Sequence, residues 1–333
     1  MKLGVDIFSL RYNDWDAYRH LEYAASIGLD IVHFSDMGPF ESLDDGYLAS
    51  VKAKAEALGI EIEVGMDSIC PTSTAFHPED GTAPEQVRRM LDVAAQLESK
   101  VLRCYLGTNA DRHTELPLAT HIKGVVETCQ AVRDMAMDLG CKIAIENHAG
   151  DLQARELRAM IEAAGPEYVG ACIDPGNAMW VHEDPFVTLE YLGPYVATSH
   201  ARDTAVWSHP KGAAVQWVAM GEGGVGIADW ARAYMETCPN APFTMEIITG
   251  FAPRVLNYFE AEYWEAFSET PAWEFARFEK LVREGQPFEG TMLVAPRGVP
   301  MPDEYLSAFA LQQRLDLERS VRFCHELGIG ERA

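Results

Sequence analysis

Short apolar segments alternate with longer amphipathic segments along most of the chain. Eight of the apolar segments are brief, contain many β-branched residues and are followed by polar or turn residues, which is typical of buried strands. They begin near Leu3, Ile31, Ile60, Val101, Ile143, Val169, Val196 and Phe243. The pattern therefore predicts eight strands, separated by segments long enough to form helices.

The segments between these strands carry helix signals. In residues 84–97, Pro84 occupies the first turn and apolar residues recur at helical spacing. Asp151 stands where it can cap a helix over 151–164, which a glycine then ends. The same reasoning predicts further helices over 14–27, 43–58, 116–139, 185–192, 227–237 and 307–327.

The regular alternation indicates one architecture for the whole chain. Repeated strand–helix units of this size place strands in parallel with right-handed crossovers. Eight such units close into a (β/α)8 barrel, so we expect a single TIM-barrel domain over residues 1–333. An open doubly wound sheet is the alternative, but the first strand lacks the GxGxxG that a dinucleotide fold would carry.

One segment exceeds what a barrel needs. Residues 251–305 separate the eighth strand from the last helix and are rich in aromatic residues and proline. A loop of this length is usually functional or interfacial, and its aromatic content argues against a disordered linker. We expect a helical insertion that covers the carboxyl-terminal mouth of the barrel or meets a partner chain.

Composition narrows the possible partners. The chain has 51 acidic and 27 basic residues, a formal net charge of −24. Such a surface repels phosphate backbones and anionic membranes, so nucleic-acid and membrane binding are not expected. No apolar run is long enough to span a bilayer, and the N-terminus lacks the features of a signal peptide. Seven scattered cysteines without a CxxC fit apolar fillers in a reducing cytoplasm.

Candidate chemistry stands where the last four strands end. In a TIM barrel, catalytic groups lie at the carboxyl ends of the strands. Here these ends read IEN (145–147), DPGN (174–177), SHARD (199–203) and MEI (245–247). Three converging carboxylates would repel one another unless a cation neutralised them. Three carboxylates and an imidazole suit one divalent metal ion, with Mn²⁺ preferred over Mg²⁺, Co²⁺ or Zn²⁺.

These four motifs, with GEGGVGIADW at 221–230, resemble the xylose isomerase-like barrel superfamily of sugar isomerases, epimerases and dehydratases. The resemblance covers residues 1 to about 250. It implies that the metal ligands are Glu146, Asp174, His200 and Glu246. It also implies an enediol or enolate mechanism on a keto or aldehyde sugar, in which the epimerases use the two metal-binding glutamates as acid and base.

The sequence departs from the epimerases at two positions. Asn177 stands where they commonly have histidine, and His148 follows Glu146 by two residues. Positions i and i+2 of a strand share a face, so His148 can point into the same cavity as Glu146. It is either a general base or a group that merely orients a ligand.

Both departures and the insertion are similar to the larger subunit of bacterial C-glycoside deglycosidases. That resemblance implies proton removal α to the ketone of a 3-oxo C-glycoside, an enediolate, and β-elimination of the aromatic aglycone. It also implies an oligomer with a small β-sandwich partner subunit that docks on the insertion. Ketose 3-epimerase, sugar isomerase, dehydratase and oxo-sugar-acid decarboxylase activities stay open, as does a non-catalytic barrel subunit.

Four further residues are candidates for contact with a sugar. Arg202 shares a face with His200 and either binds substrate or pairs with Asp203. Asn177, His33 and Arg103 are the other candidates, although packing inside the barrel is the alternative for His33 and Arg103. Trp180 and Trp217 either stack on a flat aglycone or pack their loops.

Overall fold

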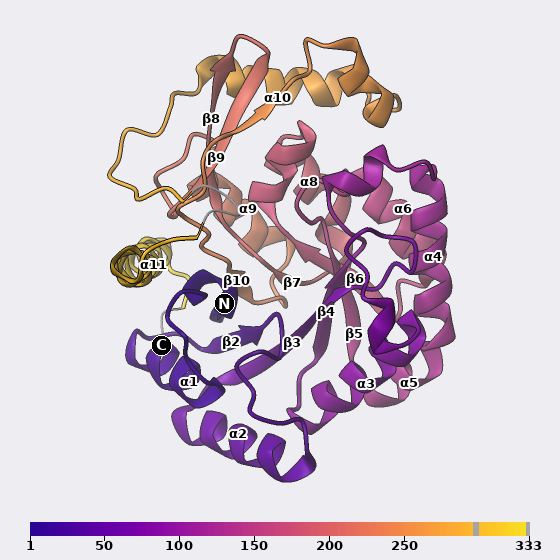
Figure 1. The fold of residues 1–333 in the computed structure, drawn as a ribbon, viewed down its shortest axis with the longest axis vertical. Helices are drawn as coiled ribbons and strands as arrows, with labels where there is room; N and C mark the ends of the chain where they lie inside the picture. Colours follow the sequence, from indigo (N-terminus) through magenta and orange to yellow (C-terminus); the bar gives the residue numbers. More distant parts are fainter. Residues whose placement is uncertain (296–299, 331–333) are drawn as a thin grey trace.

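The computed structural model describes residues 1–295 and 300–330, and within them eight parallel strands surround a common axis (Figure 1). The strand order is β10-β1-β2-β3-β4-β5-β6-β7. The eight predicted strands are confirmed. They are β1 (Leu3–Asp6), β2 (Ile31–Phe34), β3 (Glu61–Ser68), β4 (Val101–Tyr105), β5 (Lys142–Glu146), β6 (Val169–Ile173), β7 (Val196–Ser199) and β10 (Phe243–Met245).

A short parallel contact closes the sheet into a barrel. Just after β7, Ala201 forms a parallel bridge with Met245 of β10. The backbone N–H of Ala201 donates to the carbonyl of Thr244 at 2.8 Å, and the N–H of Glu246 donates to the carbonyl of Ala201 at 3.0 Å. The two edges are thus joined, and the predicted (β/α)8 barrel is confirmed.

Helices pack around the barrel where the apolar periodicity places them. Those near the barrel wall are α1 (Ala17–Ser26), α2 (Asp45–Leu58), α3 (Ala83–Gln96), α4 (Leu118–Ala131), α5 (Arg133–Leu139), α6 (Ala154–Ala164), α8 (Pro185–Leu192), α9 (Ile227–Thr237) and α11 (Asp303–Glu326). Short α7 (Pro175–Ala178) follows β6. The helix predicted over 116–139 is interrupted at Val132, whose φ and ψ of −118° and 7° are not helical.

Asp151 does not cap α6, which corrects the prediction for that residue. Gln153 occupies the cap position and forms a capping box with Glu156. The fully buried Asp151 carboxylate instead accepts hydrogen bonds from the backbone N–H groups of Gly107, His148 and Leu152. It thereby joins the loops that follow β4 and β5.

A second small sheet stands beside the barrel. Strands β8 (Asp203–His209) and β9 (Gly212–Val218) form an antiparallel hairpin, and β11 (Arg254–Leu256) pairs with β9. The eight strands predicted from the sequence do not include this hairpin.

The insertion at 251–305 packs on this hairpin (Figure 1). It contains β11, a 3-10 helix at Ala261–Phe267 and α10 (Ala272–Glu284), so it is helical only in part; residues 296–299 lie outside the described structure. Its aromatic residues join a core of their own with Met179, Trp180 and Trp217. The described residues include no helix both long and apolar enough to cross a membrane.

Candidate active site

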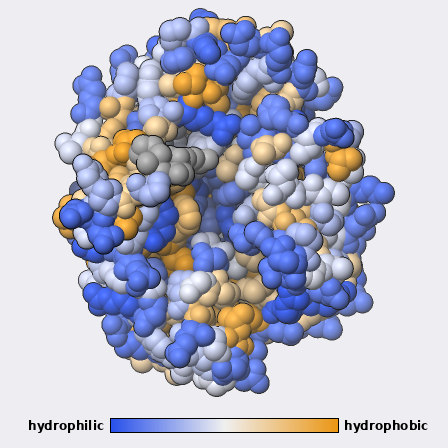
Figure 2. Space-filling model, in the orientation of Figure 1, coloured by the Kyte–Doolittle hydropathy of each residue, from blue (hydrophilic) through white to orange (hydrophobic). Residues whose placement is uncertain are grey.

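A cavity of about 530 Å³ opens at the carboxyl ends of the strands. The face in Figure 2 is hollowed near its middle, where hydrophilic residues predominate. The lining combines polar strand-end residues with aromatic residues of the hairpin and the insertion. It includes Asp36, Asp67, Arg103, Tyr105, Asn109, His148, Asn177, Trp180, Arg202, Trp217, Glu246, Phe251 and Arg254.

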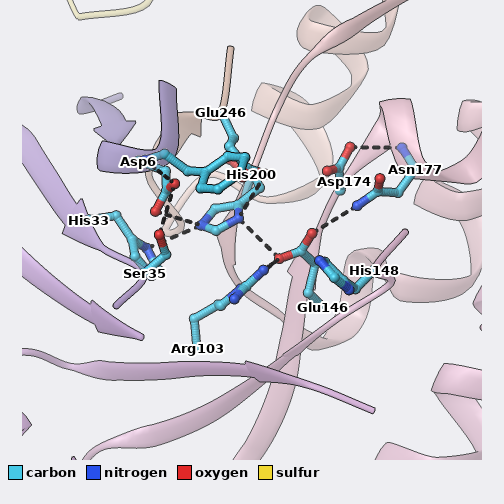
Figure 3. Close-up of polar contacts among 12 residues, drawn as sticks. Asp6, His33, Ser35, Arg103, Glu146, His148, Asp174, Asn177, His200 and Glu246 are labelled. Carbon is cyan, nitrogen blue, oxygen red and sulfur yellow. Dashed lines mark hydrogen bonds and ion pairs between the residues drawn. The ribbon is translucent and has the colours of Figure 1, made fainter. Parts of the chain in front are cut away.

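Three of the predicted ligands converge beneath this cavity. Glu146 ends β5, Asp174 follows β6 and Glu246 follows β10; one carboxylate oxygen of each lies within 4.8 Å of the other two. His200 follows β7, and its Nδ1 lies 3.0 Å from Glu146 Oε2 and 3.4 Å from Glu246 Oε2 (Figure 3). The structure therefore brings all four residues together.

The DPGN motif gives Asp174 two roles. Its Oδ1 accepts hydrogen bonds from the backbone N–H groups of Gly176 and Asn177, which caps α7. Its Oδ2 forms an ion pair with Arg202 and faces the other carboxylates. Asn147 fixes the position of the Asp174 backbone, because its side-chain amide donates to the Asp174 carbonyl at 2.7 Å and accepts from the Asp174 N–H at 2.8 Å.

Two buried arginines offset the negative charge. Arg103 Nε donates to Glu146 Oε2 at 2.6 Å, and Arg202 forms ion pairs with Asp174 and Glu246. Burial opposes ionisation of Glu146, but Arg103 and His200 hold its pKa well below the usual range. Burial raises the pKa of Asp174 to about 6, although Arg202 opposes part of that rise.

The donor set fits a divalent metal ion. Asp174 Oδ2 and His200 Nδ1 are buried atoms near the oxygens of Glu146 and Glu246, and their contacts are with charged groups: Arg202 for Asp174, and the two glutamates for His200. Carboxylate oxygens and a neutral imidazole are suitable ligands for Mn²⁺, Mg²⁺, Co²⁺ or Zn²⁺. The four residues that the sequence singled out can therefore hold such an ion between them.

Contacts with Gly107 and Tyr105 hold His148 at the cavity wall. Its Nδ1 donates to the carbonyl of Gly107 at 2.7 Å, and its ring stacks on Tyr105 with centroids 4.0 Å apart. Burial lowers the pKa of His148 to about 4, so the imidazole is neutral near pH 7. With the proton on Nδ1, its Nε2 is the nitrogen that can accept another proton.

The predicted substrate residues fall into two groups. Asn177, Arg103 and Arg202 line the cavity, and Asn177 Nδ2 also donates to Glu146 Oε1 at 2.8 Å. Arg202 contacts the ligand carboxylates, whereas Asp203 accepts hydrogen bonds from backbone N–H groups instead. His33 differs from the prediction: it is fully buried behind His200, with Nδ1 3.0 Å from Glu63 Oε2, and does not line the cavity.

Two tryptophan rings stacked between two arginine side chains form one wall of the cavity. The sequence did not predict this arrangement. Trp180 and Trp217 stack with centroids 4.4 Å apart and an interplanar angle of 14°. Arg254 lies 4.4 Å from the Trp180 ring, and Arg202 lies 4.5 Å from the Trp217 ring. The two tryptophans were predicted as loop residues. Their stacking depends on the hairpin, which could have been recognised from the turn residues Pro210 and Gly212 between two runs rich in apolar residues.

The family profile described as xylose isomerase-like TIM barrel matches residues 21–250. The chain belongs to this family. A curated relative, 3-oxo-isoapionate decarboxylase from Pectobacterium atrosepticum, is 21% identical over 70% of this chain and 77% of its own length.

Solved structures share the fold at low identity. A D-psicose 3-epimerase crystallised in the presence of D-fructose is 17% identical, covers 99% of this chain and 100% of its own, and has a TM-score of 0.63. The IOLI protein with a bound zinc atom is 15% identical, covers 84% of this chain and 96% of its own, and has a TM-score of 0.58. At these identities the likeness establishes the fold alone.

Proposed function

We propose that this protein is a divalent-metal-dependent enzyme that removes a proton α to the carbonyl of an oxidised sugar. The observation that carries the proposal is that His148 lines the same cavity as Glu246, whose carboxylate converges with those of Glu146 and Asp174. Glu146, Asp174, His200 and Glu246 would hold the ion, with Mn²⁺ preferred. When bound, it would polarise the carbonyl and stabilise the negative charge of the enediolate.

The protein's own groups supply the proton transfer. His148 is the general base, because Gly107 holds the proton on Nδ1 and leaves Nε2 to accept the proton from the substrate. Arg103 and Asn177 hold the two oxygens of Glu146 and keep its position fixed. In the epimerase alternative, Glu146 and Glu246 would exchange the proton on opposite faces of the sugar carbon.

The sharpest form of the proposal is the deglycosidation of a 3-oxo C-glycoside. Proton transfer to His148 forms the enediolate; its electron pair then expels the aglycone by cleavage of the carbon–carbon bond, and the aglycone carbon takes a proton. The wall of Trp180, Trp217 and Phe251 supports this form, since the ring edges of the two stacked tryptophans and the side chain of Phe251 give the cavity apolar surface beside the polar sugar side. The insertion would be the surface on which a small β-sandwich subunit docks to form an oligomer.

Decarboxylation of an oxo-sugar acid is the second candidate. It is favoured by the similarity to 3-oxo-isoapionate decarboxylase, and its carbanion would need the same stabilisation as the enediolate. Three arginines line the cavity and place positive charge near a substrate carboxylate: Arg103 and Arg202, which also pair with the site carboxylates, and Arg254. Ketose 3-epimerase, isomerase and dehydratase activities share the proton abstraction and differ in the fate of the enediolate.

One experiment separates these activities. Purified protein loaded with Mn²⁺ is incubated in D₂O with ketoses, oxo-sugar acids and 3-oxo aryl C-glycosides, and products are followed by NMR. Release of the free aromatic compound supports deglycosidation, loss of CO₂ supports decarboxylation, and a deuterated ketose isomer supports epimerisation. No exchange and no product with any of these substrates, from protein that binds the metal, would contradict the proposal.

A further inference from the structure

Asp6 is a buried carboxylate that the proposed reaction does not use. It ends β1 and is fully buried. Its Oδ1 accepts hydrogen bonds from the backbone N–H of Phe8 at 2.9 Å and from Ser35 Oγ at 3.0 Å. Its Oδ2 has no hydrogen bond and lies 3.8 Å from His200 Nε2 (Figure 3).

The two nitrogens of His200 face different surroundings. Nδ1 faces Glu146 and Glu246, and Nε2 faces Asp6 and His33. An imidazole that binds a metal through Nδ1 must present a lone pair there, so its proton is on Nε2. A buried N–H group needs an acceptor, since leaving it unpaired costs about 1–3 kcal/mol.

His33 is not a suitable acceptor for that proton. Its Nδ1 lies 3.0 Å from Glu63 Oε2, which also accepts from the hydroxyls of Thr198 at 2.9 Å and Thr244 at 3.3 Å. Since the Glu63 carboxylate accepts hydrogen bonds from the groups around it, we assign the His33 proton to Nδ1, which donates to Glu63. The same Nδ1 lies 3.4 Å from His200 Nε2, and because its proton is directed at Glu63 it offers no lone pair to His200.

We infer that Asp6 is a positioning residue that accepts the Nε2 proton of His200 and thereby keeps Nδ1 directed at the metal. This inference rests on the proposed metal site. Carboxylates in this relation to a ligand histidine fix its tautomer and ring orientation, and their loss typically weakens metal binding 10- to 100-fold. Because His33 Nδ1 donates to Glu63, His33 cannot accept the Nε2 proton of His200 in place of Asp6.

The test measures Co²⁺ binding by the full chain after chelator treatment, by absorbance titration. Asp6→Asn keeps the size of the side chain and the acceptor for Phe8, but turns an amide donor toward Nε2. We expect about 10- to 100-fold weaker Co²⁺ binding. The matched control is Ser35→Ala, which removes a bond to the other oxygen of Asp6 and should change the affinity less than about threefold.

The outcomes separate this inference from the proposed function. Failure of the wild-type protein to bind Co²⁺ contradicts the metal site itself. Wild-type binding with equal affinity in Asp6→Asn overturns the role of Asp6 alone. If Asp6→Asn does not fold, ¹⁵N NMR of the Zn²⁺-loaded wild-type protein decides: a proton on His200 Nε2 supports the inference, and an unprotonated Nε2 overturns it.

Discussion

Arg202 is the group whose replacement most directly tests the electrostatics of the site. Its guanidinium is 1% exposed, pairs with Asp174 and Glu246, and lies 3.9 Å from Glu146 Oε1. Arg202→Met keeps a long apolar side chain for the contact with Trp217 and removes the charge. In the absence of metal, the carboxylates then lose the cation that two of them contact directly.

The expected loss of stability follows from the burial of these groups. Breaking a buried ion pair by removing one partner typically costs about 3–5 kcal/mol, because the remaining charge is left uncompensated. With an unfolding entropy of about 2.1 cal/mol/K per residue, the 333-residue chain has roughly 0.7 kcal/mol/K. The melting temperature of Arg202→Met in chelator should therefore fall by about 4–7 °C.

The assay is thermal unfolding by circular dichroism, with chelator and with Mn²⁺. Mn²⁺ should raise the melting temperature of Arg202→Met more than that of the wild type, because the ion supplies the missing positive charge. Arg254→Met is the control, since it removes the arginine at the Trp180 end of the same stack; Mn²⁺ should raise its melting temperature no more than that of the wild type. Equal stability of Arg202→Met and wild type in chelator would refute this account of the cluster.

Three other changes probe separate parts of the structure. Glu146→Gln should abolish metal binding and activity, and elemental analysis that finds a full equivalent of metal would contradict its role. His148→Ala should keep the metal but slow α-proton exchange by about 10²–10⁴-fold; unchanged exchange measured in D₂O would exclude it as the base. Burial raises the pKa of Glu183 to about 8, so its folded state binds more protons than the unfolded state between about pH 4.5 and 8. The stability that Glu183 contributes is thus present below about pH 4.5 and lost by pH 8. The melting temperature of Glu183→Gln should therefore rise relative to that of the wild type as the pH rises. A difference in melting temperature that stays constant from pH 5 to 8.5 would contradict this.

The barrel was predictable because each of its parts leaves a local signal. Strands buried on both faces are short continuous apolar runs, and the helices between them show apolar periodicity and glycine stops. The hairpin at 203–218 left a weaker signal: Pro210 and Gly212 mark a turn between two runs rich in apolar residues, but the first run follows the polar site residues after β7 directly. Its partner strand β11 comes from the insertion, and a pairing across 35 residues or more cannot be read from local pattern.

The site also contains residues that the sequence predicted and residues that it did not. Glu146, Asp174, His200 and Glu246 were predictable because the ends of parallel strands meet at one rim. Asp6 was overlooked because it lies within an apolar run, LGVDIF, where only its complete burial beside His200 reveals a role. His33 was misplaced because strand alternation fixes which face a residue shares, but not how deep in the barrel its ring lies.

Net charge is a property of the whole surface and does not describe the cavity. The chain carries −24 overall, which argues against polyanionic partners, yet Arg103, Arg202 and Arg254 line one small cavity together with Asp36 and Asp67. Exposed charges more than about 10 Å away are largely screened at physiological salt, whereas groups in the cavity act at short range and partly without water. Glu246 also lines the cavity, so a small anionic or enolising substrate meets a local balance of three arginines and three carboxylates, which acts on it more strongly than the acidic surface does. The acidity that disfavours nucleic acid is thus compatible with the carboxylated substrate of a decarboxylase as well as with the neutral sugar of a C-glycoside, and the products released must decide between them.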